Sequence, residues 1–339
     1  MTKANNPDRR EALKKIVAGG AAIATGAAFL SHEDRVLAEQ LAQETAQRAP
    51  GVGPGNTDAW WKAHTNWDRL SGLREKMTTA TIKGVEFSKI ITGGNLIGGW
   101  AHARDLIYAS QLVQEYHTRG KIVATFKLAE ACGINTHLGH HSQIAIMTDY
   151  WKNEGGKLQY FADCANLDAA LDCVDKGATA VYLQGGVCDH LVRQENFDVL
   201  AQFVERFKND GIPVGLSGHW IETIKACVAQ GLEPDVWLKT IHHGNYWSRK
   251  PGQPEHGNVF DRDPEATIAF METLKEPWIG FKVLAAGAIE PRDGFRFAFE
   301  AGSDFLCVGM YDFQIVDDVN ICMDILRSGV QRNRPWRFT

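Results

Sequence analysis

Short apolar runs alternate with amphipathic helical patterns along most of the chain, and many helical patterns end at a glycine. Apolar runs of roughly 4–8 residues between turn signals are typical of strands buried in a parallel sheet. The pattern predicts eight strands, at about residues 86–92, 134–139, 157–163, 179–184, 212–217, 235–241, 278–284 and 304–309. Left-handed helix caps are expected at Gly133, Gly177, Gly211, Gly231 and Gly302, each of which directly follows an amphipathic stretch.

Eight strands that alternate with helices predict an α/β fold, a (β/α)8 TIM barrel in a single domain. An open doubly wound sheet is disfavoured because no Gly-x-Gly-x-x-Gly motif follows the first strand. We assign the barrel to residues 81–339 and a polar linker and docking segment to residues 39–80. An additional helix is expected at about residues 105–117, before the regular helix that follows the first strand.

Composition and charge narrow the range of partners. The 339 residues are 44% hydrophobic and 23% charged, which is typical of a soluble globular protein. The formal net charge is -5, and no basic run lies beyond the first fifteen residues, so nucleic acid is excluded as the main partner. We expect a small-molecule ligand, and the sequence leaves a homo-oligomer open.

The N-terminus resembles a twin-arginine export signal. Asp8-Arg9-Arg10-Glu11-Ala12-Leu13-Lys14 precedes a weakly apolar run that is too short and too rich in glycine and alanine for a membrane span. Val36-Leu37-Ala38 provides a small-x-small cleavage site. Residues 1–38 are therefore expected to be a signal peptide. It would be recognised by the twin-arginine export machinery and would direct the protein to the periplasm or cell envelope.

Two lysines, Lys239 and Lys282, lie within otherwise apolar runs. A buried ammonium group is unfavourable unless it is paired or neutralised, so both lysines are candidates for chemistry. A lysine whose pKa is lowered by burial and by a neighbouring cation is a nucleophile toward carbonyl groups. The structural alternative is a buried salt bridge, for example with Asp163.

Further polar side chains lie near the predicted strand ends, where a barrel of this kind builds its active site. The alternation of side chains along a strand predicts which of them share a face. We expect one cavity to receive His137, Asp163, Gln184, His219, Lys239, His243 and Lys282.

The last third of the chain resembles class I aldolases of the deoxyribose-phosphate aldolase type, over about residues 234–310. The resemblance rests on Leu238-Lys239-Thr240 and on the segment from Phe281-Lys282-Val283 to Ala301-Gly302-Ser303-Asp304. It implies a lyase without a required cofactor, in which Lys239 forms an imine and Lys282 tunes it. An exported enzyme of this type would act on a carbonyl-bearing carbohydrate or sugar acid. In this interpretation His219 or His243 moves the proton, and Asp163 and Gln184 orient hydroxyl groups. Further substrate contacts are expected from His137, His242, Tyr246, Gly287 and Gly309.

Metal catalysis is the main alternative. His219, His243 and Asp312 resemble the metal ligands of amidohydrolase-type barrels, and imidazole with carboxylate suits zinc, manganese or iron. This interpretation implies a sugar hydrolase or isomerase.

Hydride transfer is a second alternative, because residues 92–135 resemble the opening of aldo-keto reductases. That family requires an aspartate and a tyrosine after strand two and a lysine on strand three, whereas the third predicted strand here ends in Asp163. A sugar-binding barrel without catalytic activity is the non-enzymatic alternative.

Overall fold

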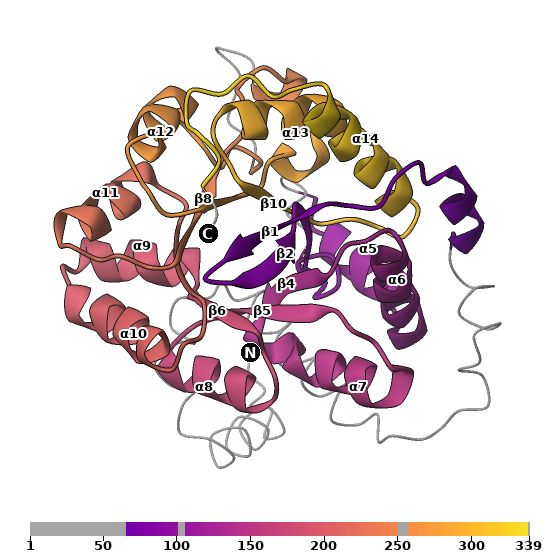
Figure 1. Ribbon diagram of the computed structural model, residues 1–339, viewed down its shortest axis with the longest axis horizontal. Helices are drawn as coiled ribbons and strands as arrows, with labels where there is room; N and C mark the ends of the chain where they lie inside the picture. Colours follow the sequence, from indigo (N-terminus) through magenta and orange to yellow (C-terminus); the bar gives the residue numbers. More distant parts are fainter. Residues whose placement is uncertain (1–65, 101–105, 250–256, 338–339) are drawn as a thin grey trace, which may run out of the picture.

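The computed structural model describes residues 66–100, 106–249 and 257–337, and the expected signal peptide lies outside these residues. Eight parallel strands form a closed barrel in the order β10-β3-β4-β5-β6-β7-β8-β9. They are β3 (Ile90–Gly93), β4 (Thr136–His140), β5 (Gln159–Cys164), β6 (Ala180–Leu183), β7 (Val214–Gly218), β8 (Val236–Thr240), β9 (Trp278–Phe281) and β10 (Phe305–Val308). The predicted (β/α)8 barrel is confirmed (Figure 1).

Helices surround the barrel. They are α5 (Ala109–Tyr116), α6 (Arg119–Ala131), α7 (Ile144–Glu154), α8 (Leu167–Asp175), α9 (Gly185–Arg193), α10 (Phe197–Asn209), α11 (Ile221–Ala229), α12 (Pro264–Met271), α13 (Pro291–Glu300) and α14 (Ile315–Arg327). Short 3-10 helices are η1 (Trp67–Gly72), η2 (His141–Gln143), η3 (Trp247–Arg249) and η4 (Ala285–Gly287). All five glycines predicted as left-handed caps have a positive φ angle. The expected additional helix corresponds to α5.

The first predicted strand is in fact parts of two strands. A hairpin of β1 (Thr79–Ile82) and β2 (Val85–Ser88) turns at Lys83-Gly84, and β3 begins directly afterwards. Both turn residues have positive φ angles, as a two-residue hairpin turn requires. Residues 85–93 mix apolar with polar side chains and contain no proline or internal glycine, so the pattern alone did not reveal the bend at Lys89.

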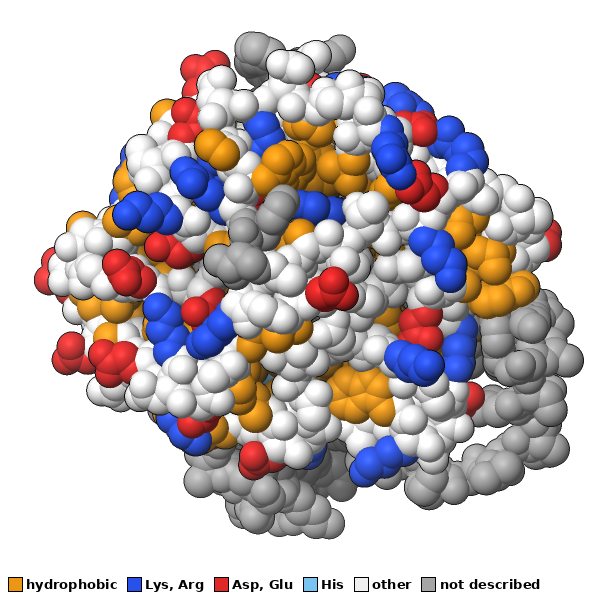
Figure 2. Space-filling model, in the orientation of Figure 1, with side chains coloured by type: hydrophobic (Ala, Val, Ile, Leu, Met, Phe, Trp, Pro, Cys, Tyr) orange, Lys and Arg blue, Asp and Glu red, His pale blue; other side chains and the backbone are white. Residues whose placement is uncertain are grey.

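The hairpin closes the amino-terminal end of the barrel (Figure 1). Ile82 and Phe87 are fully buried and pack with the side chains that fill the barrel interior. The Phe87 and Phe161 ring centroids are 5.7 Å apart. Figure 2 shows this end of the molecule, where acidic and basic side chains are interspersed with apolar patches.

The segments on either side of the barrel pack against it. On the amino-terminal side, Trp67 and Leu70 of η1 pack on the layer between strands and helices. In the segment that follows the last helix of the chain, Arg334 is almost completely buried. Its Nη1 lies 2.6 Å from Oδ2 of Asp304, the residue before β10. Within the described residues, no helix has the length and apolar character needed to cross a membrane.

Candidate active site at the carboxyl end of the barrel

The barrel interior defines which strand residues face inward. Leu138, Phe161, Tyr182 and Leu238 pack together in it, whereas Trp237 belongs to the layer between strands and helices. Alternation therefore sends Asp163 inward on β5, next to Tyr182 of β6, with which it is paired in register. The predicted inward faces of β5, β6 and β7 are confirmed.

The carboxyl group of Asp163 is strongly perturbed. Burial raises its pKa to about 7, although Gln184, Tyr182 and the charge of Lys282 act in the opposite direction. Gln184 Nε2 donates to Asp163 Oδ2 over 3.4 Å, whereas the shielded Oδ1 has no hydrogen-bond partner. A carboxyl group with a pKa close to neutrality can both accept and donate a proton during a reaction.

Lys282 lies at the same end, directly after β9 rather than in the middle of a strand as predicted. Its φ angle is 58°, a left-handed conformation that costs a non-glycine residue about 1–3 kcal/mol. This backbone interrupts the alternation after the inward Phe281. As a result, Lys282 is close enough to two other inward residues, Asp163 and Cys307, to affect their pKa values. Its Nζ lies 4.1 Å from the ring centroid of Phe260.

His219 follows β7 and is held by a carboxylate that the sequence did not single out. Asp189 of α9 is buried, and its Oδ2 lies 2.8 Å from His219 Nδ1. The other oxygen accepts a 2.6 Å hydrogen bond from Thr223 Oγ1. A Cβ atom at Gly185 would be only 3.0 Å from Cε1 of His219, so the close approach of α9 depends on this glycine. With Nδ1 fixed by Asp189, the Nε2 atom of His219 is available for proton transfer.

His140 was also missed as a site residue. It ends β4 on the inward face and pairs in register with Asp163. The Ser142 amide donates to His140 Nδ1 over 3.3 Å, which places the proton of the neutral ring on Nε2. Burial lowers the pKa of His140 well below its usual range. The ring centroid of Trp100 lies 4.8 Å away, and the buried Trp100 Nε1 has no hydrogen-bond partner. Both groups could donate a hydrogen bond to a substrate oxygen.

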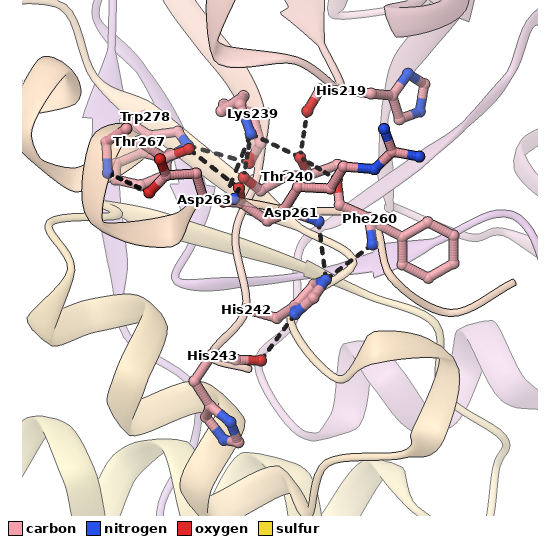
Figure 3. Close-up of polar contacts among 12 residues, drawn as sticks. His219, Lys239, Thr240, His242, His243, Phe260, Asp261, Asp263, Thr267 and Trp278 are labelled. Atoms are coloured by element: carbon pink, nitrogen blue, oxygen red, sulfur yellow. Dashed lines mark hydrogen bonds and ion pairs between the residues drawn. The ribbon is translucent and has the colours of Figure 1, made fainter. Parts of the chain in front are cut away.

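Lys239 does not share this site, which corrects the predicted inward face of β8. It lies on the same face as Trp237, and its side chain is fully buried. Its Nζ donates to the carbonyl and hydroxyl oxygens of Thr240, both over 2.7 Å, and lies 3.6 Å from Asp261 Oδ2 (Figure 3). The buried salt bridge proposed as the structural alternative therefore exists, but with Asp261 rather than Asp163.

The predicted inward position of His137 is also wrong. Its ring packs against Phe126 of α6, with 4.8 Å between centroids, in the layer between strands and helices. Its ring nitrogens contact Thr92 Oγ1 at 2.9 Å and Gln143 Oε1 at 3.1 Å. Burial lowers the pKa of His137 to about 4, so the residue is a neutral packing histidine.

The predicted site residues after β8, namely His242, His243 and Tyr246, contact different parts of the structure. His242 is fully buried, and its Nε2 accepts hydrogen bonds from the amides of Phe260 and Asp261. Figure 3 shows His243 directed away from Lys239. Its ring lies 5.4 Å from that of Phe297 on α13. Tyr246 donates its hydroxyl hydrogen to the Asn258 carbonyl over 3.1 Å, which ties the two parts of this loop together.

The predicted metal ligands do not come together. His219 contacts Asp189 and His243 packs on α13, while Asp312 Oδ2 lies 3.0 Å from Lys121 Nζ. Among residues 66–100, 106–249 and 257–337, no group of three histidine, cysteine, aspartate or glutamate side chains is placed to hold a metal ion.

The two glycines expected to contact substrate, Gly287 and Gly309, are both exposed. Gly287 has a φ angle of 82° and has no atom near the position that a Cβ would occupy. Gly309 directly follows β10, on the same end of the barrel as Asp163 and Lys282.

The fold and this arrangement place the chain in the TIM-barrel class, and comparison with known proteins agrees. Two solved structures described as aldo-keto reductases from Pseudomonas aeruginosa are similar to it. One is 14% identical, with 75% of this chain and 99% of the other covered and a TM-score of 0.53. The second is 16% identical, with 76% and 99% covered and a TM-score of 0.53. At these identities the likeness shows the fold alone.

A structure of N-acetylneuraminic acid synthetase from Leptospira borgpetersenii serovar Hardjo-bovis is 9% identical, with 77% of this chain and 94% of the other covered and a TM-score of 0.45. No protein-family model matches the chain, and no curated protein matches it.

Proposed function

We propose that the protein is an exported enzyme of the lyase type that acts on a carbonyl-bearing carbohydrate or sugar acid. Its lysine-dependent step uses Lys282 instead of Lys239. The observation that carries the proposal is the placement of Lys282 and Asp163 at the same end of the barrel, where the charge of Lys282 acts on a carboxyl group whose pKa burial raises to about 7. Strained backbone at a strand end of the barrel is itself typical of functional sites.

The pair supports imine chemistry in balanced steps. Lys282 first passes a proton to the Asp163 carboxylate, which is a better proton acceptor than an ordinary carboxylate because its pKa is raised. The free amine then adds to the substrate carbonyl carbon, and one of its protons moves to the carbonyl oxygen to form a hydroxyl group. Asp163 returns its proton to this hydroxyl group, which leaves as water, and the protonated imine forms.

His219 is suited to the step that breaks a carbon–carbon bond. Its Nε2 takes the proton of the substrate hydroxyl group, while Asp189 stabilises the resulting imidazolium through Nδ1. The electron pair of the broken bond moves into the iminium group and forms an enamine. His140 Nε2 and Trp100 Nε1 remain available to bind substrate oxygens.

The test is an activity screen of the purified protein against hydroxylated 2-oxo acids and keto-sugars, with release of an aldehyde fragment as the readout. We expect Asp163→Asn and Lys282→Met to lose about 100-fold or more of the turnover, which is the usual size of an acid–base contribution. The control is His243→Ala, because His243 packs on α13. Turnover that survives in Lys282→Met would contradict the proposal.

A further inference from the structure

The buried pair Lys239–Asp261 belongs to a network that reaches the candidate site. Lys239 Nζ binds Thr240 Oγ1 at 2.7 Å, and Asp261 Oδ1 accepts a 3.2 Å hydrogen bond from Thr267 Oγ1 on α12 (Figure 3). Both members of the pair are almost completely buried, and a buried ion pair is seldom the most stable option for such a position. The cost of retaining it suggests a role beyond stability.

The network fixes the backbone of Phe260 from two sides. Its amide donates a 3.0 Å hydrogen bond to His242 Nε2, and its carbonyl lies 3.3 Å from Thr240 Oγ1, whose single hydrogen it shares with the closer His219 carbonyl at 2.9 Å. His242 is suited to this function because burial lowers its pKa to about 4 and keeps Nε2 unprotonated as an acceptor. The salt bridge holds the next residue, Asp261, in place.

We infer that Lys239 is a positioning residue, which acts with Asp261, Thr240 and His242 to hold the Phe260 ring against Lys282. The inference rests on the proposed function, in which Lys282 is the reactive lysine. The Phe260 ring centroid lies 4.1 Å from Lys282 Nζ, well within cation–π range. Such a contact favours the ammonium form over the free amine, as does a negative charge on Asp163. The network thereby limits the reactivity of Lys282 before substrate binds.

The experiment measures the rate at which trinitrobenzenesulfonate modifies Lys282 at a fixed pH of about 7.5, resolved by mass spectrometry of peptides. We expect Phe260→Leu to raise this rate about two- to thirtyfold, because the ring no longer stabilises the cation. Phe260→Trp should stay within about twofold of the wild type. The double variant Lys239→Met/Asp261→Leu removes both charges together and should raise the rate as Phe260→Leu does.

Two controls separate positioning from a general loss of structure. Lys176, the exposed residue directly after α8, is the internal reference in each digest. Phe270→Leu removes a different lysine–phenylalanine contact, with Lys225 Nζ 5.7 Å from the ring centroid, and should leave Lys282 unchanged. If the double variant does not fold, Thr240→Val tests the link between Lys239 and Phe260, since it removes the hydroxyl group that accepts from Lys239 Nζ and lies 3.3 Å from the Phe260 carbonyl.

An unchanged Lys282 rate in Phe260→Leu would show that the ring does not control the lysine. A raised rate in Phe260→Leu with a wild-type rate in the folded network variant would overturn the role of Lys239. Because no substrate is used, these results are independent of the activity screen, and either proposal can fail while the other stands.

Discussion

At the carboxyl end of β5, the surroundings of Asp163 determine its protonation. Burial raises its pKa from 3.8 to about 7, so the folded protein holds a proton that the unfolded chain releases from about pH 4 upward. The contribution of this residue to the free energy of unfolding therefore falls as the pH rises from about 4 to 7. This loss of stability is a cost that the proposed function explains, because catalysis needs the group near neutrality.

Asp163→Asn should remove this pH dependence. We expect the free energy of unfolding of the variant to exceed that of the wild type by about 1–2 kcal/mol at pH 8 and by much less at pH 5. The figure at pH 8 includes a reduction because Asp163 is only partly shielded from solvent. Urea unfolding at the two pH values measures the difference. Asp175→Asn, an exposed carboxyl group on α8, is the control. A gain of equal size at both pH values would contradict the assigned protonation.

At the scale of strands and loops, the sequence predicted the barrel and the inward faces of β5, β6 and β7. It failed at β4 and β8 because both faces of a parallel strand are buried, so alternation does not show which face is inside. On the outer face, the charge of Lys239 is paired with that of Asp261, which is 22 residues further along the chain and is therefore not marked by the strand's own pattern. Likewise, no sequence pattern marked the left-handed backbone of Lys282.

The β1–β2 hairpin gives a test of the barrel at this scale. Phe87→Ala should lower the free energy of unfolding by about 3–5 kcal/mol, because the ring is fully buried at the base of the barrel. Glu86→Ala changes an exposed side chain of the same strand and should stay within about 0.5 kcal/mol of the wild type. Equal effects of the two substitutions in denaturant unfolding would show that the hairpin does not close the barrel.

For the whole molecule, the two ends of the barrel have different roles. The amino-terminal end is closed by the hairpin, and the ion pair of Arg334 with Asp304 secures the C-terminal segment to the barrel. The carboxyl end gathers polar groups from β4, β5, β6, β7 and β9, namely His140, Asp163, Gln184, His219 and Lys282. This division matches the general placement of active sites in TIM barrels.

The most direct test of this account is the position of a trapped adduct. The protein is incubated with a panel of hydroxylated 2-oxo acids and keto-sugars, reduced with borohydride and mapped by peptide mass spectrometry. We predict a substrate-derived mass on Lys282 that is absent from Lys282→Met and retained in Lys239→Met/Asp261→Leu. An adduct on Lys239, or none with any member of the panel that the protein turns over, would contradict the account.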